Sequence, residues 1–494
     1  MRAAQARSAA LDTVAWGPLI GLGIAVAAGL LAVANRYGYH RDELYFLEAG
    51  DHLAWGYPDQ PPYVALMARA MDAIAEGSLV ALRTPSAITI ALLTLVTGLV
   101  ARELGADRLG QTLAAAVMAT GGVALGSGHL LSTTPPSLLT WAVVTWLVLR
   151  GLRTGHGPLW LLAGGAAGLG LQANSNVVFL LAAILAGLLL AGSRATLRTW
   201  WPWAGAALAV GLWAPYLLWQ AREGWPQLEV SASITAGESG TSEPRELFLP
   251  LQLVMLNPFM APVWIAGGVR LLRDPALAWC RGLGWCWPLL AAVFLVTGGK
   301  PYYLSGTMPL LLGAGAPLAI TWARQARSRA VVLVVGVALG LPAVFVTWPL
   351  VPPDRFADSL AAANYDLGEQ IGWPDLVAQV AAVVERQDGP VALLASNYGE
   401  AGALDRYGDG YSLPQAHSGH MGYWHWGPPP DDADIVVAVG FDRATLARAF
   451  DEVSPAGRVD NGLGVDNDEQ GAPIWVCRGL RQPWGDLWAD FRDL

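Results

Sequence analysis

Two adjacent carboxylates, Asp42 and Glu43, lie in a stretch crowded with reactive side chains. His40 and Arg41 precede them and Tyr45 follows. A carboxylate can take the proton from an attacking hydroxyl, which is the role of a general base. Since ionisable groups are costly to hold at a membrane, and this stretch follows a long apolar segment, it is a candidate functional site with Asp42 as the base. Taken alone, the stretch is more typical of a juxtamembrane turn with an interfacial belt of aromatic residues, and the residues described below change this balance.

A second polar stretch, residues 55–62, reads Trp-Gly-Tyr-Pro-Asp-Gln-Pro-Pro. Its Asp59 and Gln60 are candidates for positioning the acceptor or shaping the loop. His40, Arg41 and Tyr45 are candidates for the same task. Glu43 and Asp59 are expected either to position the acceptor or to hold a metal ion.

Lys300 is the only lysine, and every other fixed cation is an arginine. A compact ammonium at the end of an apolar segment, followed by Tyr302 and Tyr303, suits a phosphate group whose bridging oxygen is leaving. A lysine that extends its stem to the membrane interface would also fit. Two arginines, Arg222 and Arg245, are weaker candidates for phosphate contact. They lie in segment 221–246, whose glycine and serine content predicts a mobile loop.

A carboxylate base, a phosphate-binding cation and a membrane together suit one kind of enzyme. A transferase whose donor is a sugar on a lipid phosphate needs all three. Asp42 would accept the proton of the acceptor hydroxyl, while Lys300, with the hydroxyl of Tyr302 or Tyr303, would hold the departing phosphate.

The composition places these residues in a membrane protein. The 494 residues are 54% hydrophobic and 14% charged, more apolar than a soluble core can absorb. The net charge of −9 gives no basic face for nucleic acid. Three cysteines, Cys280, Cys286 and Cys477, are too few and too distant for a disulfide framework, and we expect no disulfide.

Apolar windows long enough to cross a bilayer recur along the first 350 residues. We expect about eleven spans, at 15–34, 79–101, 109–128, 132–150, 158–173, 175–192, 202–220, 247–271, 283–298, 302–321 and 330–348. Arginines cluster at alternate ends of these windows, which predicts a cytoplasmic N-terminus and puts Asp42 and everything after Trp348 outside the cytoplasm. Segment 63–76 has helical spacing but is too short to span, so we expect an amphipathic helix on the outer surface.

The composition changes after Pro353. The pattern predicts a helix at 376–384 and strands at 391–395, 435–439 and 474–477. The expected fold is therefore an α-helical polytopic membrane domain over 1–350, followed by an extracytoplasmic α/β domain over 351–494.

Four motifs resemble one known family. They are residues 40–45 (His-Arg-Asp-Glu-Leu-Tyr), 55–62, Leu218-Trp219-Gln220 with Gly224-Trp225-Pro226, and 300–303 (Lys-Pro-Tyr-Tyr). Together with segments 397–403 and 464–470, they are similar to the bacterial dolichyl-phosphate-mannose-protein mannosyltransferase family, which includes aminoarabinose transferases and belongs to the GT-C glycosyltransferases. The resemblance implies a polyprenyl-phosphate sugar donor, inverting transfer outside the cytoplasm at a bacterial plasma membrane, and Asp42 as the catalytic carboxylate.

The sequence departs from this family at two positions. Ser137 stands where related sequences usually carry an aspartate, and Asn174 where they often carry a lysine. The departures leave open an altered donor or metal requirement, or a non-catalytic relative that binds polyprenyl phosphate and scaffolds envelope assembly. A lipid transporter would fit the number of spans, but the ionisable residues gather at one membrane face and no repeat is visible.

A metal site is the remaining open question. His417, His420 and His425 have spacing that could support one, but a surface loop is favoured because no clear fourth ligand follows. Residues 466–469 lack the full pattern of a calcium loop. No cofactor is certain, a divalent cation stays open, and the sugar, the acceptor and the oligomeric state are not specified by the sequence.

Overall fold

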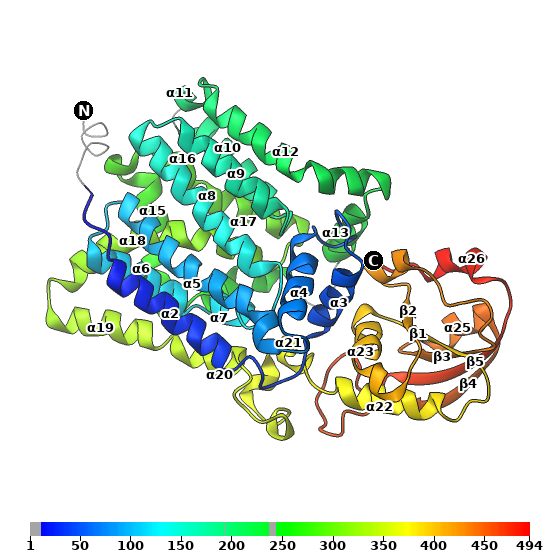
Figure 1. Cartoon of the computed structure of the whole chain (residues 1–494). Helices are drawn as coiled ribbons and strands as arrows, with labels where there is room; N and C mark the ends of the chain where they lie inside the picture. The colour runs from blue at the N-terminus through cyan, green and yellow to red at the C-terminus, as the bar shows by residue number, and fades with distance from the viewer. Residues whose placement is uncertain (1–10, 193, 237–243) are drawn as a thin grey trace. The chain divides into compact units, whose positions relative to one another are not determined.

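The computed structural model describes residues 11–192, 194–236 and 244–494, which form two compact units (Figure 1). The first unit comprises Met1–Ala32, Arg83–Glu223 and Ser231–Val344. The second comprises Val33–Leu82, Gly224–Val230 and Phe345–Leu494. The second unit thus contains the segment around Asp42 as well as the C-terminal region.

The first unit is helical throughout its described part. Its helices are α2 (Trp16–Ala32), α5 (Leu79–Glu103, which begins in the second unit), α6 (Arg108–Ala119), α7 (Gly122–Ser127), α8 (Thr134–Thr154), α9 (Pro158–Leu171), α10 (Val177–Ala191), α11 (Arg194–Leu197), α12 (Trp201–Arg222), α13 (Pro226–Ala236, also shared with the second unit), α14 (Phe248–Met255), α15 (Ala261–Arg273), α16 (Arg281–Gly284), α17 (Cys286–Thr297), α18 (Met308–Ala323) and α19 (Arg327–Ala338). Short 3₁₀ turns join several of them, including η1 (Arg245–Leu247) and η4 (Pro301–Thr307).

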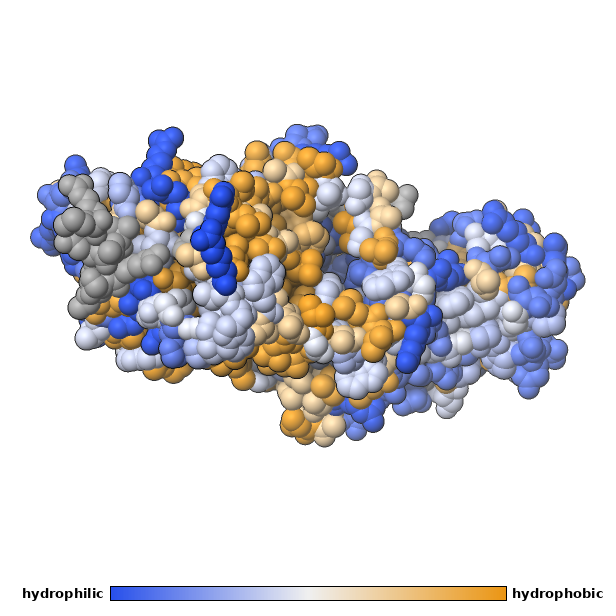
Figure 2. Space-filling view, turned by 90° about the horizontal axis from the view of Figure 1, so that it is seen from above, coloured by the Kyte–Doolittle hydropathy of each residue, from blue (hydrophilic) through white to orange (hydrophobic). Residues whose placement is uncertain are grey.

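Apolar side chains cover much of the outside of these helices. Figure 2 shows hydrophobic residues gathered on the helical unit and hydrophilic residues over the sheet of the second unit. Four valines of α19 are exposed, for example, Val334 at 70%. Such a surface is costly in water and matches lipid.

Fewer helices than expected have both the length and the apolar composition of a full span. By length and composition, three described helices could cross a membrane, Leu79–Glu103, Pro301–Ala323 and Arg327–Thr347, and a fourth if the bent pair Arg245–Met255 and Pro258–Arg273 is one span. Other expected spans appear as shorter apolar helices, such as α9 with 14 residues and α10 with 15, whereas crossing a bilayer takes about 20 residues. The polytopic helical class is confirmed, and the count of eleven stays a prediction.

The second unit holds a five-stranded mixed sheet in the order β2-β1-β3-β5-β4. The strands are β1 (Val391–Ala395), β2 (Ala416–Ser418), β3 (Ile435–Val439), β4 (Phe450–Arg458) and β5 (Pro473–Leu480). β1 is parallel to β2 and β3, and β5 is antiparallel to β3 and β4. Every residue of β3 is buried, as expected for a continuous apolar run at the centre of a sheet.

Helices of the second unit come from both ends of the chain. They are α3 (Arg41–Asp51), α4 (Tyr63–Ile74), α20 (Val344–Thr347, which begins in the first unit), α21 (Tyr365–Gly368), α22 (Trp373–Val384), α23 (Tyr398–Gly408), α24 (Gly422–Trp426), α25 (Arg443–Ala449) and α26 (Trp484–Leu487). α3 packs against both α4 and α23. The N-terminal segment that carries Asp42 is therefore built into the same unit as the C-terminal sheet.

The elements predicted after Pro353 are confirmed. The helix expected at 376–384 lies within α22, and the three expected strands are β1, β3 and β5. The helix expected at 63–76 is α4, while its place on a membrane surface stays a prediction. The three cysteines are buried free thiols.

Candidate functional site

Asp42 and Glu43 occupy the first turn of helix α3. His40 is the N-cap, and its Nδ1 accepts a hydrogen bond from the Asp42 backbone N–H at 3.2 Å. Glu43 Oε2 accepts from the His40 N–H at 3.0 Å, which completes a capping box. Acidic residues are favourable here because the helix N-terminus carries partial positive charge. The stretch predicted to be a loop is therefore the start of a helix.

This arrangement corrects the part expected of Glu43. Its side chain is fully buried, and one carboxylate oxygen caps the helix. A residue held in this way stabilises α3 and is not exposed to an acceptor. His40, which is 5% exposed, likewise serves as a cap.

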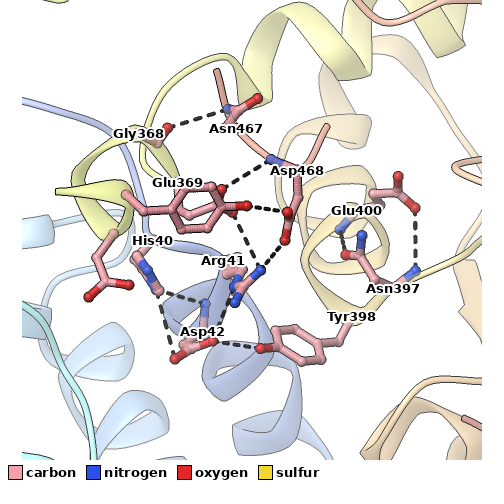
Figure 3. Close-up of polar contacts among 12 residues, drawn as sticks. His40, Arg41, Asp42, Gly368, Glu369, Asn397, Tyr398, Glu400, Asn467 and Asp468 are labelled. Atoms are coloured by element: carbon pink, nitrogen blue, oxygen red, sulfur yellow. Dashed lines mark hydrogen bonds and ion pairs between the residues drawn. The ribbon is translucent and has the colours of Figure 1, made fainter. Parts of the chain in front are cut away.

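Asp42 is the partly exposed carboxylate of the pair, with 38% of its side chain accessible. Its Oδ1 accepts a hydrogen bond of 2.8 Å from the hydroxyl of Tyr398, the first residue of α23 (Figure 3). Arg41 Nε lies 3.9 Å from the same oxygen. Burial and the nearby Asp42 carboxylate hold the pKa of Tyr398 well above its usual value, so the phenol keeps the proton that it donates.

Arg41 faces two carboxylates from the C-terminal region. It forms an ion pair with Asp468, and its Nη1 lies 3.7 Å from Oε2 of Glu369 (Figure 3). Glu369 is fully buried, which raises its pKa, while Arg41 opposes that shift. The Asp468 N–H donates to Glu369 Oε1 at 3.1 Å, and the Tyr365 hydroxyl donates to Asp468. Arg41 is thereby fixed beside Asp42.

The buried Tyr45 and the half-buried Asp59 form a second pair. The Tyr45 hydroxyl donates to Asp59 Oδ1 at 2.9 Å, and burial raises the pKa of Asp59 to about 7. The next residue, Gln60, is 2% exposed, and neither side-chain amide atom has a hydrogen-bond partner among the residues that the structure describes. A buried amide without partners is costly, so Gln60 is suited to meet a ligand.

The predicted phosphate-binding residues belong to the first unit. Lys300 is half-buried and is the N-cap residue of η4, the turn that contains Tyr302 and Tyr303. A Cβ built on Gly298 would lie 3.8 Å from Nη2 of Arg245, so the structure brings Arg245 to the segment that carries Lys300. Asp42 and Lys300 are in different units, and their expected proximity stays a prediction.

The segment expected to be a mobile loop is partly helical. Arg222 is the last residue of α12 and is exposed, and residues 226–236 form α13. Residues 237–243 lie outside the described part of the chain. The small polar residues of α13 leave it without a clear apolar face, so its sequence pattern did not predict a helix.

Two of the three histidines considered for a metal, His417 and His420, have separate contacts. His417 Nδ1 is 3.1 Å from the Gly427 carbonyl oxygen, and His420 Nδ1 accepts from the Tyr398 backbone N–H at 3.3 Å. Within residues 11–192, 194–236 and 244–494, no group of three or more His, Cys, Asp and Glu side chains is placed to hold a metal ion.

Comparisons with known proteins agree with this architecture. Residues 59–219 match the model of the dolichyl-phosphate-mannose-protein mannosyltransferase family. The crystal structure of ArnT from Cupriavidus metallidurans in the apo state aligns with a TM-score of 0.59 at 13% identity, covering 92% of this chain and 97% of that one. Residues 59–219 are thus similar to this mannosyltransferase family, and the chain shares the fold of ArnT.

Further solved structures share this fold. ArnT bound to undecaprenyl phosphate has a TM-score of 0.57 at 13% identity, covering 92% of this chain and 97% of that one. The Archaeoglobus fulgidus oligosaccharyltransferase AglB, in complex with an inhibitory peptide and a dolichol-phosphate, has a TM-score of 0.52 at 11% identity, covering 86% of this chain and 69% of that one. No curated protein matches by sequence.

Asn174 and Ser137, the two positions at which we expect a departure from the family pattern, are both associated with helix α8. Asn174 Nδ2 donates to Thr133 Oγ1 at 3.2 Å, at the start of α8, the helix that carries the buried Ser137.

Sequence reasoning assigned no role to Tyr398, Glu369 or Asp468. One signal was available in residues 397–403, Asn-Tyr-Gly-Glu-Ala-Gly-Ala. Asn397 and Glu400 form a capping box that fixes the start of α23. A Cβ on Gly402 would lie 2.9 Å from Leu44 Cβ, so the helical glycine marks the close approach of α23 to α3.

Proposed function

We propose that this GT-C protein transfers a sugar from a polyprenyl-phosphate donor to an acceptor hydroxyl. The observation that carries the proposal is the partly exposed Asp42 at the start of α3, held by Tyr398 and flanked by Arg41. The family match and the shared fold support the class of donor, since solved structures contain ArnT bound to undecaprenyl phosphate and AglB in complex with a dolichol-phosphate.

Asp42 acts as the general base in the proposed reaction. The acceptor oxygen attacks the anomeric carbon of the donor sugar and passes its proton to the Asp42 carboxylate. The bond between that carbon and the phosphate oxygen breaks, the electron pair leaves with the polyprenyl phosphate, and the configuration inverts. A hydrogen bond on Oδ1 fixes the carboxylate while it receives the proton.

Lys300 holds the departing phosphate in this proposal, with the hydroxyls of Tyr302 and Tyr303. An ammonium stabilises the charge that develops on the phosphate oxygen as the bond breaks. Arg245 adds a second cation, which its position near Gly298 supports. Arg222 is exposed at the end of α12 and is the weaker candidate.

Gln60, with Tyr45 and Asp59, is proposed to position the acceptor. The unpartnered amide of the buried Gln60 supports this role because a hydroxyl could satisfy both its donor and its acceptor. The proposed reaction uses no divalent cation, since no cluster of His, Cys, Asp and Glu among the described residues is placed to hold one. A location in a bacterial plasma membrane, with Asp42 and the sheet outside the cytoplasm, remains part of the proposal.

Transfer of a labelled sugar tests the proposal directly. The protein is placed in lipid nanodiscs with radiolabelled polyprenyl-phosphate mannose, then with other polyprenyl-phosphate hexoses and pentoses, and with membrane extract as the acceptor source. We expect label transfer by the wild type and a loss of at least about 100-fold in Asp42→Asn, the typical contribution of a general base.

The matched control is Asp51→Asn on the same helix. Asp51 is exposed and pairs with Arg69, so its loss should leave transfer unchanged. Full activity of Asp42→Asn would refute Asp42 as the base. Donor binding without transfer, across all sugars, would instead favour a non-catalytic relative, the alternative that Ser137 and Asn174 support.

A further inference from the structure

We propose that Tyr398 is a positioning residue for Asp42, supplied to the reaction by the C-terminal region of the chain. The proposal rests on the proposed function, since it gives Tyr398 a role through the general base. The tyrosine hydroxyl donates to Asp42 Oδ1 at 2.8 Å, across 356 residues of sequence (Figure 3).

The phenol of Tyr398 is held rigidly where it meets Asp42. Its backbone begins α23, which Asn397 and Glu400 cap. Its ring stacks on His420, with centroids 4.7 Å apart and planes 16° apart, and lies 4.9 Å from the ring of Tyr45. A side chain packed on both sides presents its hydroxyl in one place, so the hydrogen bond orients Asp42 as well as stabilising its charge.

A second contact from the C-terminal region fixes the residue next to Asp42. Arg41 is drawn toward Glu369 and Asp468, and its Nε stays 3.9 Å from Asp42 Oδ1. Without these carboxylates the guanidinium could close a bidentate pair on Asp42, which would compete with the acceptor hydroxyl. The C-terminal region thus donates one hydrogen bond to Asp42, from Tyr398, and keeps the Arg41 guanidinium from closing on the Asp42 carboxylate.

The charge of Asp42 depends on several neighbours. Titratable groups that face it are His40 and Arg41 from its own helix, Tyr398 and His420 from the C-terminal region, and Asp59 from the segment after α3. Burial lowers the pKa of His420 to about 4, so this ring is neutral at neutral pH and does not replace the tyrosine. The hydrogen bond from the Tyr398 hydroxyl stabilises the ionised form of the Asp42 carboxylate more than its protonated form.

Removing this donor makes the Asp42 carboxylate easier to protonate. In Tyr398→Phe, which keeps the ring stacking, we expect kcat to fall roughly tenfold, as for the loss of one hydrogen bond to a charged group. The acid limb of the pH profile should move to higher pH, while KM for the donor should change little. A merely structural role would leave the acid limb where it is.

Tyr423→Phe is the matched control. The buried Tyr423 donates to Asp405 Oδ2 at 2.9 Å, so the variant loses the same kind of bond in the same unit and away from Asp42. We expect its kcat and pH profile to equal those of the wild type.

Carbodiimide labelling of the Asp42 peptide, followed against pH by mass spectrometry, gives a readout that needs no transfer activity. This reagent modifies protonated carboxyl groups, and Asp42 is accessible. Half-labelling should occur at a higher pH in Tyr398→Phe than in the wild type or in Tyr423→Phe. An unchanged labelling curve in Tyr398→Phe overturns the proposal. A shifted curve in a protein whose wild type transfers no sugar would refute the proposed function and keep the contact.

Discussion

Replacing Arg41 with alanine removes the cation that faces the fully buried carboxylate of Glu369. The charges are 3.7 Å apart, which corresponds to about 4.5 kcal/mol at an effective dielectric constant of about 20. Asp468 is 46% exposed, so solvent screens its share of the pairing. Removing one partner of a buried pair typically costs about 3–5 kcal/mol, and we expect a loss of about 4 kcal/mol.

Thermal unfolding in nanodiscs measures this loss. For a unit of roughly 200 residues, a change of this size lowers the unfolding midpoint by roughly 10 °C. Glu369→Gln in the Arg41→Ala background removes the uncompensated charge and should recover most of the loss. The deficit of Arg41→Ala should also shrink as the pH falls, because protonation of Glu369 then removes the same charge.

The double variant decides whether the reasoning holds. If Arg41→Ala with Glu369→Gln is as unstable as Arg41→Ala alone, the loss comes from packing of the arginine stem and not from the buried carboxylate. A loss below about 1 kcal/mol in Arg41→Ala would show that the pair behaves as a solvated surface contact.

Three further outcomes follow from the geometry. Lys300→Arg should lower kcat for transfer of the labelled sugar about tenfold or more, because a planar guanidinium does not replace a compact ammonium at one phosphate oxygen. If Lys300→Arg were as active as the wild type, the argument that this position needs a lysine would be refuted. The midpoint of unfolding should fall as the pH rises from about 4 to about 7, because burial raises the pKa of Asp59 to about 7 and the folded state takes up the proton. Burial also raises the pKa values of Glu48, Glu400 and Asp405 to about 7, so Asp59→Asn should remove one part of this slope. A slope that does not change at all in Asp59→Asn would contradict the assignment. Gly402→Ala should lower the free energy of unfolding by about 1–3 kcal/mol, because the added methyl group would lie 3.0 Å from the Leu44 backbone. The control Gly485→Ala has open space for its methyl group and should leave the free energy of unfolding unchanged.

The sheet could be predicted only where its strands are apolar. β1 and β3 are short apolar runs, and their sequence pattern is sufficient to identify them. β4 was missed because it is an edge strand, largely exposed, with Pro455 at an irregular point of its pairing. β2 has three residues, too few for a pattern.

The start of α3 was missed for a reason of local chemistry. Helix N-caps are usually Ser, Thr, Asp or Asn, and a capping box usually begins with Ser or Thr. Here His40 takes that place through its ring nitrogen. Of the two carboxylates that indicated a functional site, Glu43 caps the helix and Asp42 remains partly exposed.

The candidate site could be predicted in its N-terminal half and not in its C-terminal half, because sequence spacing carries no information on contacts across hundreds of residues. Asp42 was identified by its neighbours in sequence, whereas Tyr398, Glu369 and Asp468 are identified only by their distances to Arg41 and Asp42. The buried state of Glu369 explains why this contact is specific. The buried carboxylate of Glu369 lies at the end of α21, whereas Tyr398 begins α23. Because Arg41 pairs with Glu369 and the neighbouring Asp42 accepts from Tyr398, two separate elements of the C-terminal region hold the start of α3.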